Sequence, residues 1–286
     1  MVRLSDPLKT EDMTQNTILV VGGTGKTGRR VAERLTARGL DTRIGSRSGE
    51  PPFDWNDPGT WEAAFRGVTA AYVTYQPDLA FPGAAEAIEA ASRVAVASGV
   101  RRLVLLSGRG EEDARVSERG VTGSGAEWTV IRAAWFNQNF SESHLLAPVL
   151  SGEIALPAGD VPEPFVDADD IADVAVAALT EDGHAGRVYE LSGPRLLTFA
   201  DAAAEIAAAS GRAVRYVPVS PDEYTKALIG HGVPAEEAEA LTGLFTRVLD
   251  GRNAHLSDGV RQALGREPAD FADYARRTAA TGVWRG

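Results

Sequence analysis

The feature that most constrains the fold is a glycine-rich segment that directly follows an apolar run. Residues 18–21 read Ile-Leu-Val-Val, and Gly22, Gly25 and Gly28 follow in the spacing G-x-x-G-x-x-G. A buried strand that turns through glycines into a helix presents free backbone N–H groups and the positive end of the helix dipole to a phosphate. Because a strand pattern precedes the glycines and an amphipathic pattern follows them, the segment predicts a dinucleotide-binding α/β fold.

Two other interpretations of this segment are less favoured. Gly25-Lys26-Thr27 resembles the end of an NTPase phosphate-binding loop, but that motif requires glycine at position 20, which is Val20 inside the strand. A tight strand–helix turn without a ligand is the second alternative. It explains less well why so many glycines, which are costly for a folded chain, gather at one helix start.

Composition excludes several classes of function. Of the 286 residues, 44% are hydrophobic and 24% are charged, as in a soluble globular protein. The absence of cysteine excludes disulfides, thiolate nucleophiles and cysteine-ligated metals. The four histidines are scattered, so no metal site is expected. The net charge of −11 argues against broad nucleic-acid contact.

The chain also gives expectations about its surroundings. No apolar run approaches the roughly 18 residues of a membrane helix, and residues 1–15 are of mixed charge without an apolar signal core. We therefore expect a cytoplasmic protein that has a small-molecule substrate and does not contact membranes. Residues 1–15 are predicted to be a disordered extension. Whether the protein forms a homodimer remains open.

Short β-rich runs alternate with helical patterns, which predicts a doubly wound parallel sheet of the Rossmann type. The expected strands are 17–22, 41–46, 68–74, 101–107, 127–132, 164–166, 187–192 and 214–218. The expected helices between them are 27–38, 59–66, 82–98, 111–124, 168–180 and 198–210. Beyond about residue 220 only helices are expected, at 220–230, 234–249, 258–265 and 268–280. We assign residues 16–155 to a dinucleotide-binding domain. Residues 156–286 are assigned to the remaining Rossmann elements, interleaved with a smaller, mostly helical substrate-binding region.

Three helix starts carry capping signals. Thr198 with Asp201 and Ser220 with Glu223 match the pattern in which a hydroxyl and an acid three residues later cap the first turn. Asp167 with Asp170 is a similar arrangement, so the acidic run after Val166 is predicted to be structural rather than catalytic.

The end of the second strand indicates which dinucleotide is bound. An acidic residue there would hold the 2′-hydroxyl of NAD, whereas arginine accommodates the 2′-phosphate of NADP. The strand ends in Ser46-Arg47, and its only acid, Asp41, lies at the opposite end. With Lys26 as a second cation, NADP(H) is favoured over NAD(H). The predicted loop contacts are Gly22, Thr24, Gly25, Lys26, Thr27 and Gly28.

Two further residues are candidates for the adenine end. Asp54 could accept a hydrogen bond from the adenine amino group, with Trp55 packing beside the ring. Alternatively, Trp55 anchors the short helix around 59–66. Trp61 is expected in the core.

The catalytic pair of ordinary short-chain dehydrogenases is missing. These enzymes use Tyr-x-x-x-Lys, in which the lysine lowers the tyrosine pKa and the tyrosine transfers a proton. The three lysines, Lys9, Lys26 and Lys226, are preceded four residues earlier by Ser5, Gly22 and Asp222. The helix after Ser107 offers carboxylates and arginines instead of a phenol.

Several segments between residues 17 and 281 together resemble the NmrA-like branch of the atypical short-chain dehydrogenases. They are 22–28 (GGTGKTG), 46–48 (SRS), 100–107 (VRRLVLLS), 128–139 (WTVIRAAWFNQN), 165–172 (FVDADDIA) and 189–194 (YELSGP). The resemblance implies a Rossmann domain that binds NADP(H) and a smaller C-terminal domain that closes over the nicotinamide. Loss of the tyrosine–lysine pair is common in this branch.

The resemblance leaves two functions open. The branch contains quinone, imine and isoflavone-type reductases and tailoring enzymes of aromatic polyketide pathways in secondary metabolism. It also contains regulators that sense the dinucleotide without turning it over. We expect hydride transfer to or from a planar, electrophilic quinone, imine or enone. A closed apolar cavity beside the nicotinamide would favour an enzyme over a sensor.

The remaining candidate residues lie at the carboxyl ends of strands, where open α/β sheets bind ligands. Thr74, Tyr75 and Gln76 should border the ribose and nicotinamide, and Ser107 should lie near the nicotinamide. The candidate pocket wall is Trp135, Phe136 and Asn137, although core packing is an equal alternative for the two aromatic residues. Ser107 and Asn137 are the candidate catalytic residues. Asn137 and Gln138 are harder to place in a core, because buried amides need partners.

Overall fold

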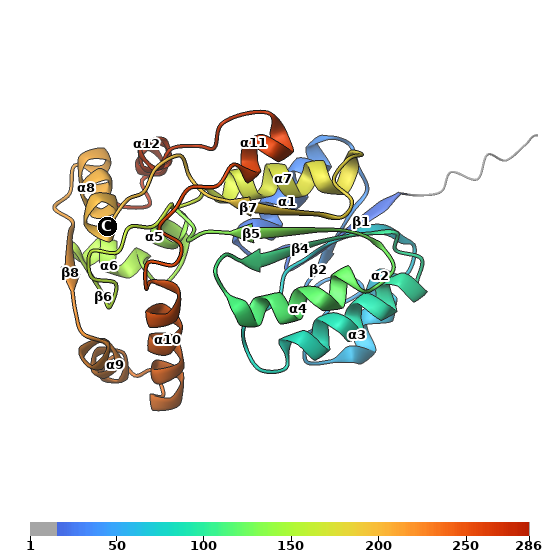
Figure 1. Ribbon diagram of the computed structural model, residues 1–286, viewed down its shortest axis with the longest axis horizontal. Helices are drawn as coiled ribbons and strands as arrows, with labels where there is room; N and C mark the ends of the chain where they lie inside the picture. Colours follow the sequence, from blue (N-terminus) through green and yellow to red (C-terminus); the bar gives the residue numbers. More distant parts are fainter. Residues whose placement is uncertain (1–15, 286) are drawn as a thin grey trace, which may run out of the picture.

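The computed structural model describes residues 16–285, so the extension predicted for residues 1–15 lies outside the described residues. Six parallel strands form the main sheet in the order β2-β1-β3-β4-β5-β7 (Figure 1). Their bounds are β1 Thr17–Val21, β2 Thr42–Gly45, β3 Val68–Val73, β4 Arg102–Gly108, β5 Glu127–Ala133 and β7 Arg187–Leu191. The doubly wound α/β prediction is confirmed.

The strand order places a ligand crevice at one edge of the sheet. From β1 the chain first moves outward to β2 and then returns to β3 on the opposite side of β1. The connections therefore leave the carboxyl ends of β1 and β3 in opposite directions. In open α/β sheets, ligands bind outside such a switch point.

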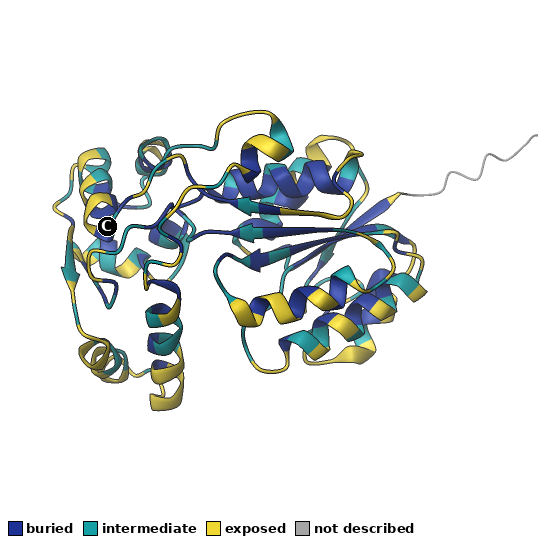
Figure 2. Ribbon diagram, viewed as in Figure 1, coloured by how far each residue is buried: buried dark blue, intermediate teal, exposed yellow. Residues whose placement is uncertain are grey.

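Helices cover both faces of this sheet, and each face has its own apolar core. On one face lie α1 (Lys26–Ala37), α7 (Ala168–Thr180) and α11 (Gly259–Leu264). The opposite face is covered by α2 (Trp61–Phe65), which follows the short helix η1 (Pro58–Thr60), and by α3 (Ala84–Ala97) and α4 (Glu112–Thr122). The sheet and the helix faces turned toward it are buried, whereas the outer helix faces are exposed (Figure 2).

A second unit lies beyond the carboxyl ends of the strands (Figure 1). Its parallel strand pair is β6 (Glu153–Leu156) and β8 (Arg215–Pro218). Its helices are α5 (Asn139–Glu142), α6 (Leu146–Ser151), α8 (Phe199–Ser210), α9 (Pro221–Gly230), α10 (Ala235–Val248) and α12 (Phe271–Thr281). The aromatic residues Phe140, Phe165, Phe199 and Phe271 form the centre of its core. The chain enters this unit after β5 and returns to the Rossmann unit for α7 and β7, and the boundary expected at residue 155 falls inside β6.

The structure corrects three strand and helix predictions. Residues 164–166 make no ladder, because only Val166 forms a parallel bridge, with Phe136. The expected strand at 214–218 exists as β8 but pairs with β6 rather than joining the main sheet. The sequence analysis missed α5, α6 and β6, which are only four to six residues long and therefore show little periodicity.

Two of the three predicted helix caps are confirmed. Thr198 and Ser220 form complete capping boxes with Asp201 and Glu223. Asp167 does cap α7, by accepting from the N–H of Asp169. The expected partner Asp170 instead accepts from Arg266 and from the N–H of Ala269, so its predicted capping role is wrong. Within residues 16–285, no helix combines the length and the apolarity that crossing a membrane would require.

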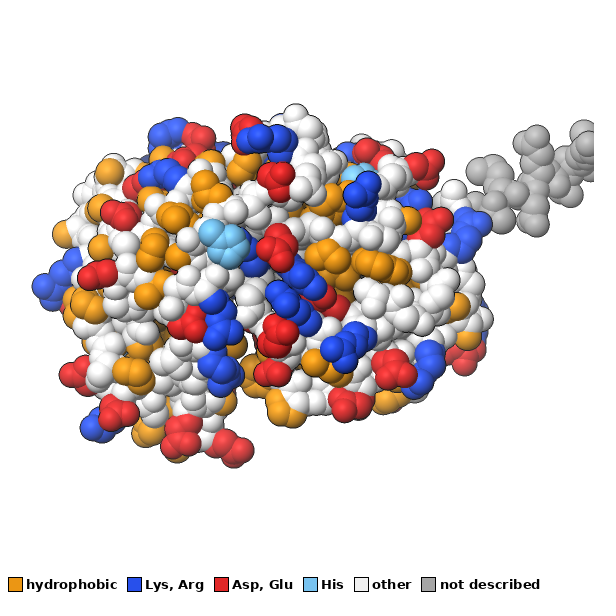
Figure 3. Space-filling view, in the orientation of Figure 1, with side chains coloured by type: hydrophobic (Ala, Val, Ile, Leu, Met, Phe, Trp, Pro, Cys, Tyr) orange, Lys and Arg blue, Asp and Glu red, His pale blue; other side chains and the backbone are white. Residues whose placement is uncertain are grey.

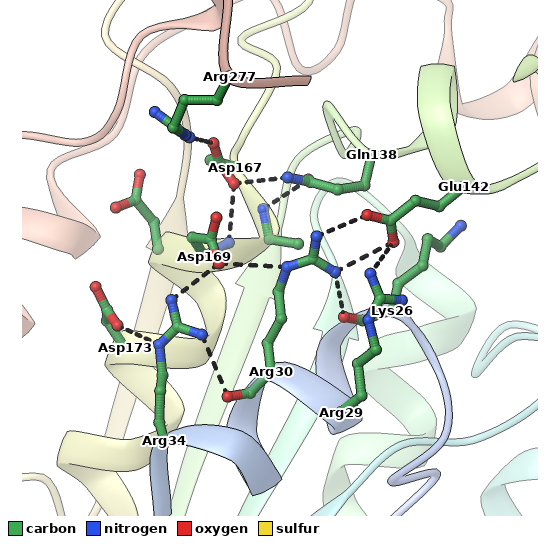
Figure 4. Close-up of polar contacts among 12 residues, drawn as sticks. Lys26, Arg29, Arg30, Arg34, Gln138, Glu142, Asp167, Asp169, Asp173 and Arg277 are labelled. Carbon is green, nitrogen blue, oxygen red and sulfur yellow. Dashed lines mark hydrogen bonds and ion pairs between the residues drawn. The ribbon is translucent and has the colours of Figure 1, made fainter. Parts of the chain in front are cut away.

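A charged network fixes α1 against the second unit and against α7 (Figure 4). Arg30 contacts Glu142 of α5 at 2.7 Å and Asp169 of α7 at 3.3 Å. Arg34 pairs with Asp169 at 2.9 Å and with Asp173 at 2.6 Å. From α12, Arg277 reaches the helix-capping Asp167 at 2.7 Å. Because these contacts join four stretches of chain, namely α1, α5, α7 with its cap residue Asp167, and α12, they hold the two units on either side of the crevice.

Candidate active site

A cavity of about 890 Å³ follows the carboxyl ends of β1 to β5 and continues between the two units. Figure 3 shows a notch between α10 and the Rossmann unit, and several α10 residues line the cavity. One part of the lining is formed by the glycine loop, the start of α1 and the ends of β2, β3 and β4, and its residues include Gly22, Thr24, Gly25, Lys26, Thr27, Ser46, Arg47, Asp54, Trp55, Thr74, Tyr75, Gln76 and Ser107. The other part is apolar and includes Trp135, Phe136, Leu241, Leu244, Phe245, Val248 and Leu249. The structure thus brings together all but two of the predicted site residues, the exceptions being Gly28 and Asn137.

The three motif glycines have different structural requirements. Gly22 has φ +72°, and a Cβ there would lie 2.1 Å from Thr74 Oγ1. A Cβ on Gly28 would lie 2.1 Å from the carbonyl oxygen of Gly22, so Gly28 allows α1 to pack closely on the loop. At Gly25 the nearest atom to an added Cβ is the Gly22 carbonyl oxygen, at 3.2 Å. The fold therefore needs Gly22 and Gly28 more strictly than Gly25, which lines the cavity.

The start of α1 fits a bound pyrophosphate. Gly25 is the N-cap residue of this helix and offers no side chain, so no side-chain hydrogen bond caps the first turn. The N–H groups of a first helical turn lack partners within the helix and carry positive partial charge. An anionic group in the cavity could accept from them without displacing a side chain.

The expected adenosine end lies at β2. Arg47 is exposed and lines the cavity together with Ser46. Asp54 uses one carboxylate oxygen to accept from the N–H of Asn56. Trp55 donates its indole N–H to the carbonyl of Thr74 and packs 5.0 Å from the ring of Tyr75. Trp55 thus both lines the cavity and supports its wall.

Lys26 extends toward the second unit. Its Nζ donates to Asn139 Oδ1 at 2.7 Å and lies 5.9 Å from the centroid of the Phe136 ring. Burial lowers the pKa of Lys26, and Arg29 and Arg30 lower it further, against the opposing effect of Glu142. The contacts of Lys26 are therefore with the nicotinamide side of the expected site, rather than with Arg47.

Ser107 is positioned by a buried ion pair. Its hydroxyl donates to Glu118 Oε1 at 2.8 Å, and Arg132 holds the same carboxylate through contacts of 2.8 and 2.7 Å. Both Ser107 and Glu118 are buried. The Ser107 oxygen keeps lone pairs with which it could accept a hydrogen bond in the cavity.

The structure places Asn137 away from the cavity wall. Its backbone N–H donates to Val166, in the bridge that also pairs Phe136 with Val166, and its side chain is fully buried. Neither amide atom of Asn137 has a hydrogen-bond partner among the described residues. By contrast, Gln138 donates to Asp167 and accepts from the N–H of Ala168. Phe136 therefore lines the cavity, whereas the side chain of Asn137 is buried in the protein interior.

Sequence reasoning missed several titratable groups in the cavity. Burial, reinforced by the neighbouring Asp78, raises the pKa of Glu111 to about 8. Burial also raises the pKa of Glu163 to about 7. In the sequence, Glu111 was marked only as the first acid of the predicted helix after Ser107. No local pattern marked Glu163, because its burial arises from the packing of the second unit.

Comparison with known proteins identifies the family. No family model matches the chain. The fold resembles that of the Citrobacter triphenylmethane reductase complexed with NADP(H), with a TM-score of 0.71 and 23% identity over 92% of this chain and 99% of that one. It also resembles a mutant of NmrA, with a TM-score of 0.70 and 18% identity over 94% of this chain and 97% of that one.

Two proteins related in sequence share a higher identity with this chain than these solved structures do. An uncharacterized oxidoreductase of Bacillus subtilis, YesF, is 32% identical over 290 residues, which cover 95% of this chain and 99% of YesF. An NAD(P)H azoreductase of Xenophilus azovorans is 32% identical over 292 residues, which cover 92% of this chain and 98% of the azoreductase. The chain belongs to the NmrA-like branch of the atypical short-chain dehydrogenases. This NmrA-like protein is accordingly an NAD(P)H-dependent oxidoreductase.

The chemically important residue at the end of β4 is Glu111, which lines the cavity. In this NmrA-like enzyme Glu111 is the N-cap residue of α4. Its carboxyl group lies so close to Gly108 that a Cβ there would be 2.2 Å from Glu111 Oε1. A carboxyl group therefore occupies the cavity at the end of β4. Burial and the neighbouring Asp78 raise the pKa of this carboxyl group, which favours its protonated form.

Proposed function

We propose that this oxidoreductase uses NADP(H) to transfer hydride to a planar, electrophilic organic substrate, such as a quinone, an imine, an enone or an azo compound. One observation carries the proposal: a single cavity joins the glycine loop and Arg47 to an apolar wall of aromatic and aliphatic side chains. A protein that only senses a dinucleotide has no need for this second, apolar part. Ligand cavities of this size, largely apolar with a few directed polar groups, are typical of small-molecule sites.

The apolar part suits a flat substrate. Trp135 from the loop after β5 and Phe245 from α10 lie with ring centroids 5.3 Å apart and form one wall. Leu241, Leu244 and Val248 extend this wall along α10. Flat aromatic substrates bury apolar area against such rings and gain from edge and offset-stacked contacts. The azo substrate class in the name of the Xenophilus azovorans relative agrees with this shape.

We assign the cofactor contacts as follows. The first turn of α1 and Gly25 would hold the pyrophosphate, and Ser46 and Arg47 the 2′-phosphate. Thr74 and Ser107 would border the ribose and nicotinamide. When bound, the cofactor supplies a hydride. The chain then has to supply a proton to the substrate heteroatom, and the cavity residue best suited to hold it is Glu111.

The NADP preference is tested by titrating the purified protein with NADPH and NADH, and by repeating both titrations with Arg47→Ala. A hydrogen bond to a charged group contributes about 1.5–3 kcal/mol, and because Arg47 is exposed we expect the lower end, or roughly a tenfold weaker NADPH affinity. NADH affinity should stay unchanged. Arg66→Ala, which removes an exposed arginine paired with Glu62, is the matched control.

Mixing the loaded protein with quinones, imines and azo compounds then tests the reaction. Consumption of NADPH with any of these substrates supports the proposed function. Tight binding of both redox forms without turnover would favour a sensor instead. An Arg47→Ala variant that binds NADPH as tightly as the parent would refute the assignment of the 2′-phosphate site.

A further inference from the structure

Among residues 16–285, four buried polar atoms without hydrogen-bond partners belong to residues that line this cavity. They are Arg109 Nη2, Glu111 Oε2, Trp135 Nε1 and Glu163 Oε1. Buried polar groups in folded proteins nearly always have partners, because an unpaired one costs about 1–3 kcal/mol. A concentration of such atoms in one cavity indicates a ligand that has polar groups of its own. The apolar wall alone would not require a ligand with polar groups.

Arg109 is the most constrained of the four residues. It lies directly after β4, between Gly108 and Gly110, and only 3% of it is exposed. Its backbone is fixed on both sides, because its N–H donates to Ala133 and its carbonyl accepts from Asn253 Nδ2 at 3.0 Å. Its side chain is buried, so the guanidinium group lies inside the protein and not in solvent.

The hydrogen bonds of this guanidinium group are incomplete. Nε lies 3.4 Å from Glu190 Oε2 and Nη1 lies 3.5 Å from the carbonyl of Asn253, both near the outer limit of a hydrogen bond. Glu190 is shared with Arg132, which lies 3.4 Å away, and Arg132 binds Glu118 more closely. Arg109 and Arg132 thus lie near two carboxylates, Glu118 and Glu190. Among the described residues, Nη2 of Arg109 donates neither of its hydrogens.

Glu163 supplies the second polar group at this place. It lies in the segment before α7, where its backbone N–H and carbonyl both pair with Leu197, and only 1% of it is exposed. Burial raises the pKa of Glu163 to about 7, with Arg109 lowering it and Asp250 raising it. Near neutral pH this carboxyl group can therefore either donate or accept a hydrogen bond.

We propose that Arg109 and Glu163 form a subsite that binds an acidic oxygen of the substrate, an ionised phenol, enol or carboxylate, with Arg109 Nη2 donating to it. The proposal rests on the proposed function for the identity of the site, and it narrows the substrate class to planar electrophiles that carry an acidic oxygen. Protonated Glu163 donates a second hydrogen bond to that oxygen, whereas ionised Glu163 repels it. Charge-assisted hydrogen bonds of this kind are shorter and stronger than neutral ones.

The charged groups around this pair set the pH dependence. Arg109 faces Glu163 from the loop after β4, and Asp250 faces it from the end of α10. Glu190 of β7 contacts Arg109 itself. A bound anion adds negative charge beside Glu163 and favours its protonated form. Affinity for an anionic ligand should therefore fall as the pH rises through about 7.

The test is an equilibrium measurement that needs no turnover. Protein saturated with NADP⁺ is titrated by calorimetry with 2-hydroxy-1,4-naphthoquinone, which is anionic at neutral pH, and with neutral 1,4-naphthoquinone. We expect the wild type to bind the anionic quinone at least about tenfold more tightly, as expected for one charge-assisted hydrogen bond. Arg109→Met should abolish this preference and Arg109→Lys should retain part of it. Arg119→Met, an exposed arginine of α4, should behave as wild type.

Glu163→Gln gives an independent measurement. This variant should keep the preference for the anionic quinone and lose its pH dependence between about pH 6 and 8. If Arg109→Met fails to fold, the Arg109→Lys and Glu163→Gln titrations still test whether these two residues bind the anionic oxygen. Equal affinity of wild type and the Arg109 variants for the anionic quinone, or a wild type that prefers the neutral one, would overturn the proposal.

Failure of the proposed function would appear differently. If NADP⁺ does not bind, or if NADPH reduces no quinone, imine, enone or azo compound, the proposed function is refuted. The preference of the unloaded protein for the anionic quinone can still be compared between wild type and Arg109→Met. Conversely, NADPH-dependent reduction of neutral quinones, with no effect of Arg109→Met on the anionic one, would refute the subsite alone.

Discussion

Replacing Glu111 by glutamine removes a carboxyl group that lines the cavity at the end of β4, beside Asp78. The pKa of about 8, against roughly 4.5 for an ordinary glutamate, keeps Glu111 mostly protonated at pH 7, where an ordinary glutamate is almost entirely ionised. Proton donation by a positioned side chain typically contributes about 10²–10⁴ in rate. We therefore expect Glu111→Gln to lower kcat at pH 7 by about 100-fold or more and to leave NADPH affinity unchanged.

The pH profile is the decisive assay for Glu111. A proton donor acts in its protonated form, so the wild-type kcat should be flat below about pH 7 and should fall about tenfold per pH unit above pH 8. Glu111→Gln should lose this fall along with most of the rate. Glu112→Gln is the matched control, because Glu112 is the next residue on α4 and its side chain is 79% exposed. A Glu111→Gln enzyme that keeps the wild-type rate, or the wild-type midpoint, would refute the role of Glu111.

Two further predictions concern stability and are checked by urea unfolding. Gly28→Ala should destabilise the protein by about 3 kcal/mol, because overpacking costs about 1–3 kcal/mol or more and the new Cβ would meet the rigid Gly22 carbonyl at 2.1 Å. Gly230→Ala, where an added Cβ meets no atom within 4 Å, should change stability little, and equal effects would contradict the packing argument. The pKa of Glu142 is lowered. Burial alone would raise this pKa, but the hydrogen bonds from Arg30 and Arg29 have the larger combined effect. The stabilisation by ionised Glu142 is therefore complete above about pH 4.5 and is lost as the pH falls through the lowered pKa. Glu142→Gln should lower the free energy of unfolding by about 1–2 kcal/mol at pH 7 and by progressively less below pH 4.5. A loss of stability that does not change with pH would contradict this prediction.

The elements that could be predicted are those with local signals. The glycine loop, the apolar strands and the long amphipathic helices carry their patterns within about 20 residues, and the structure confirms them. The same applies to the ends of strands, because the sheet brings residues such as Ser46, Thr74 and Ser107 to one edge whatever the details of the fold. Most of the polar lining of the cavity therefore follows from the sequence.

The remaining features depend on contacts between distant segments. The β6–β8 pair joins residues about 60 positions apart, so strand 214–218 could be recognised but its partner could not. Asn137 was expected in the pocket wall beside Trp135 and Phe136, but the bridge to Val166 turns its side chain inward. Glu163 owes its raised pKa to burial between the two units, which no local pattern reveals.

The central claim is that hydride passes from the cofactor to a substrate held in this cavity. It is tested most directly by loading the enzyme with NADPH that carries deuterium at one of the two C4 positions and supplying an imine or an enone, in which the transferred hydride becomes a stable C–H bond. We predict that mass spectrometry finds the label in the product from only one of the two labelled forms, and that this form reacts more slowly than unlabelled NADPH. Bound NADPH that is never consumed, or product that carries no label from either form, would contradict the account.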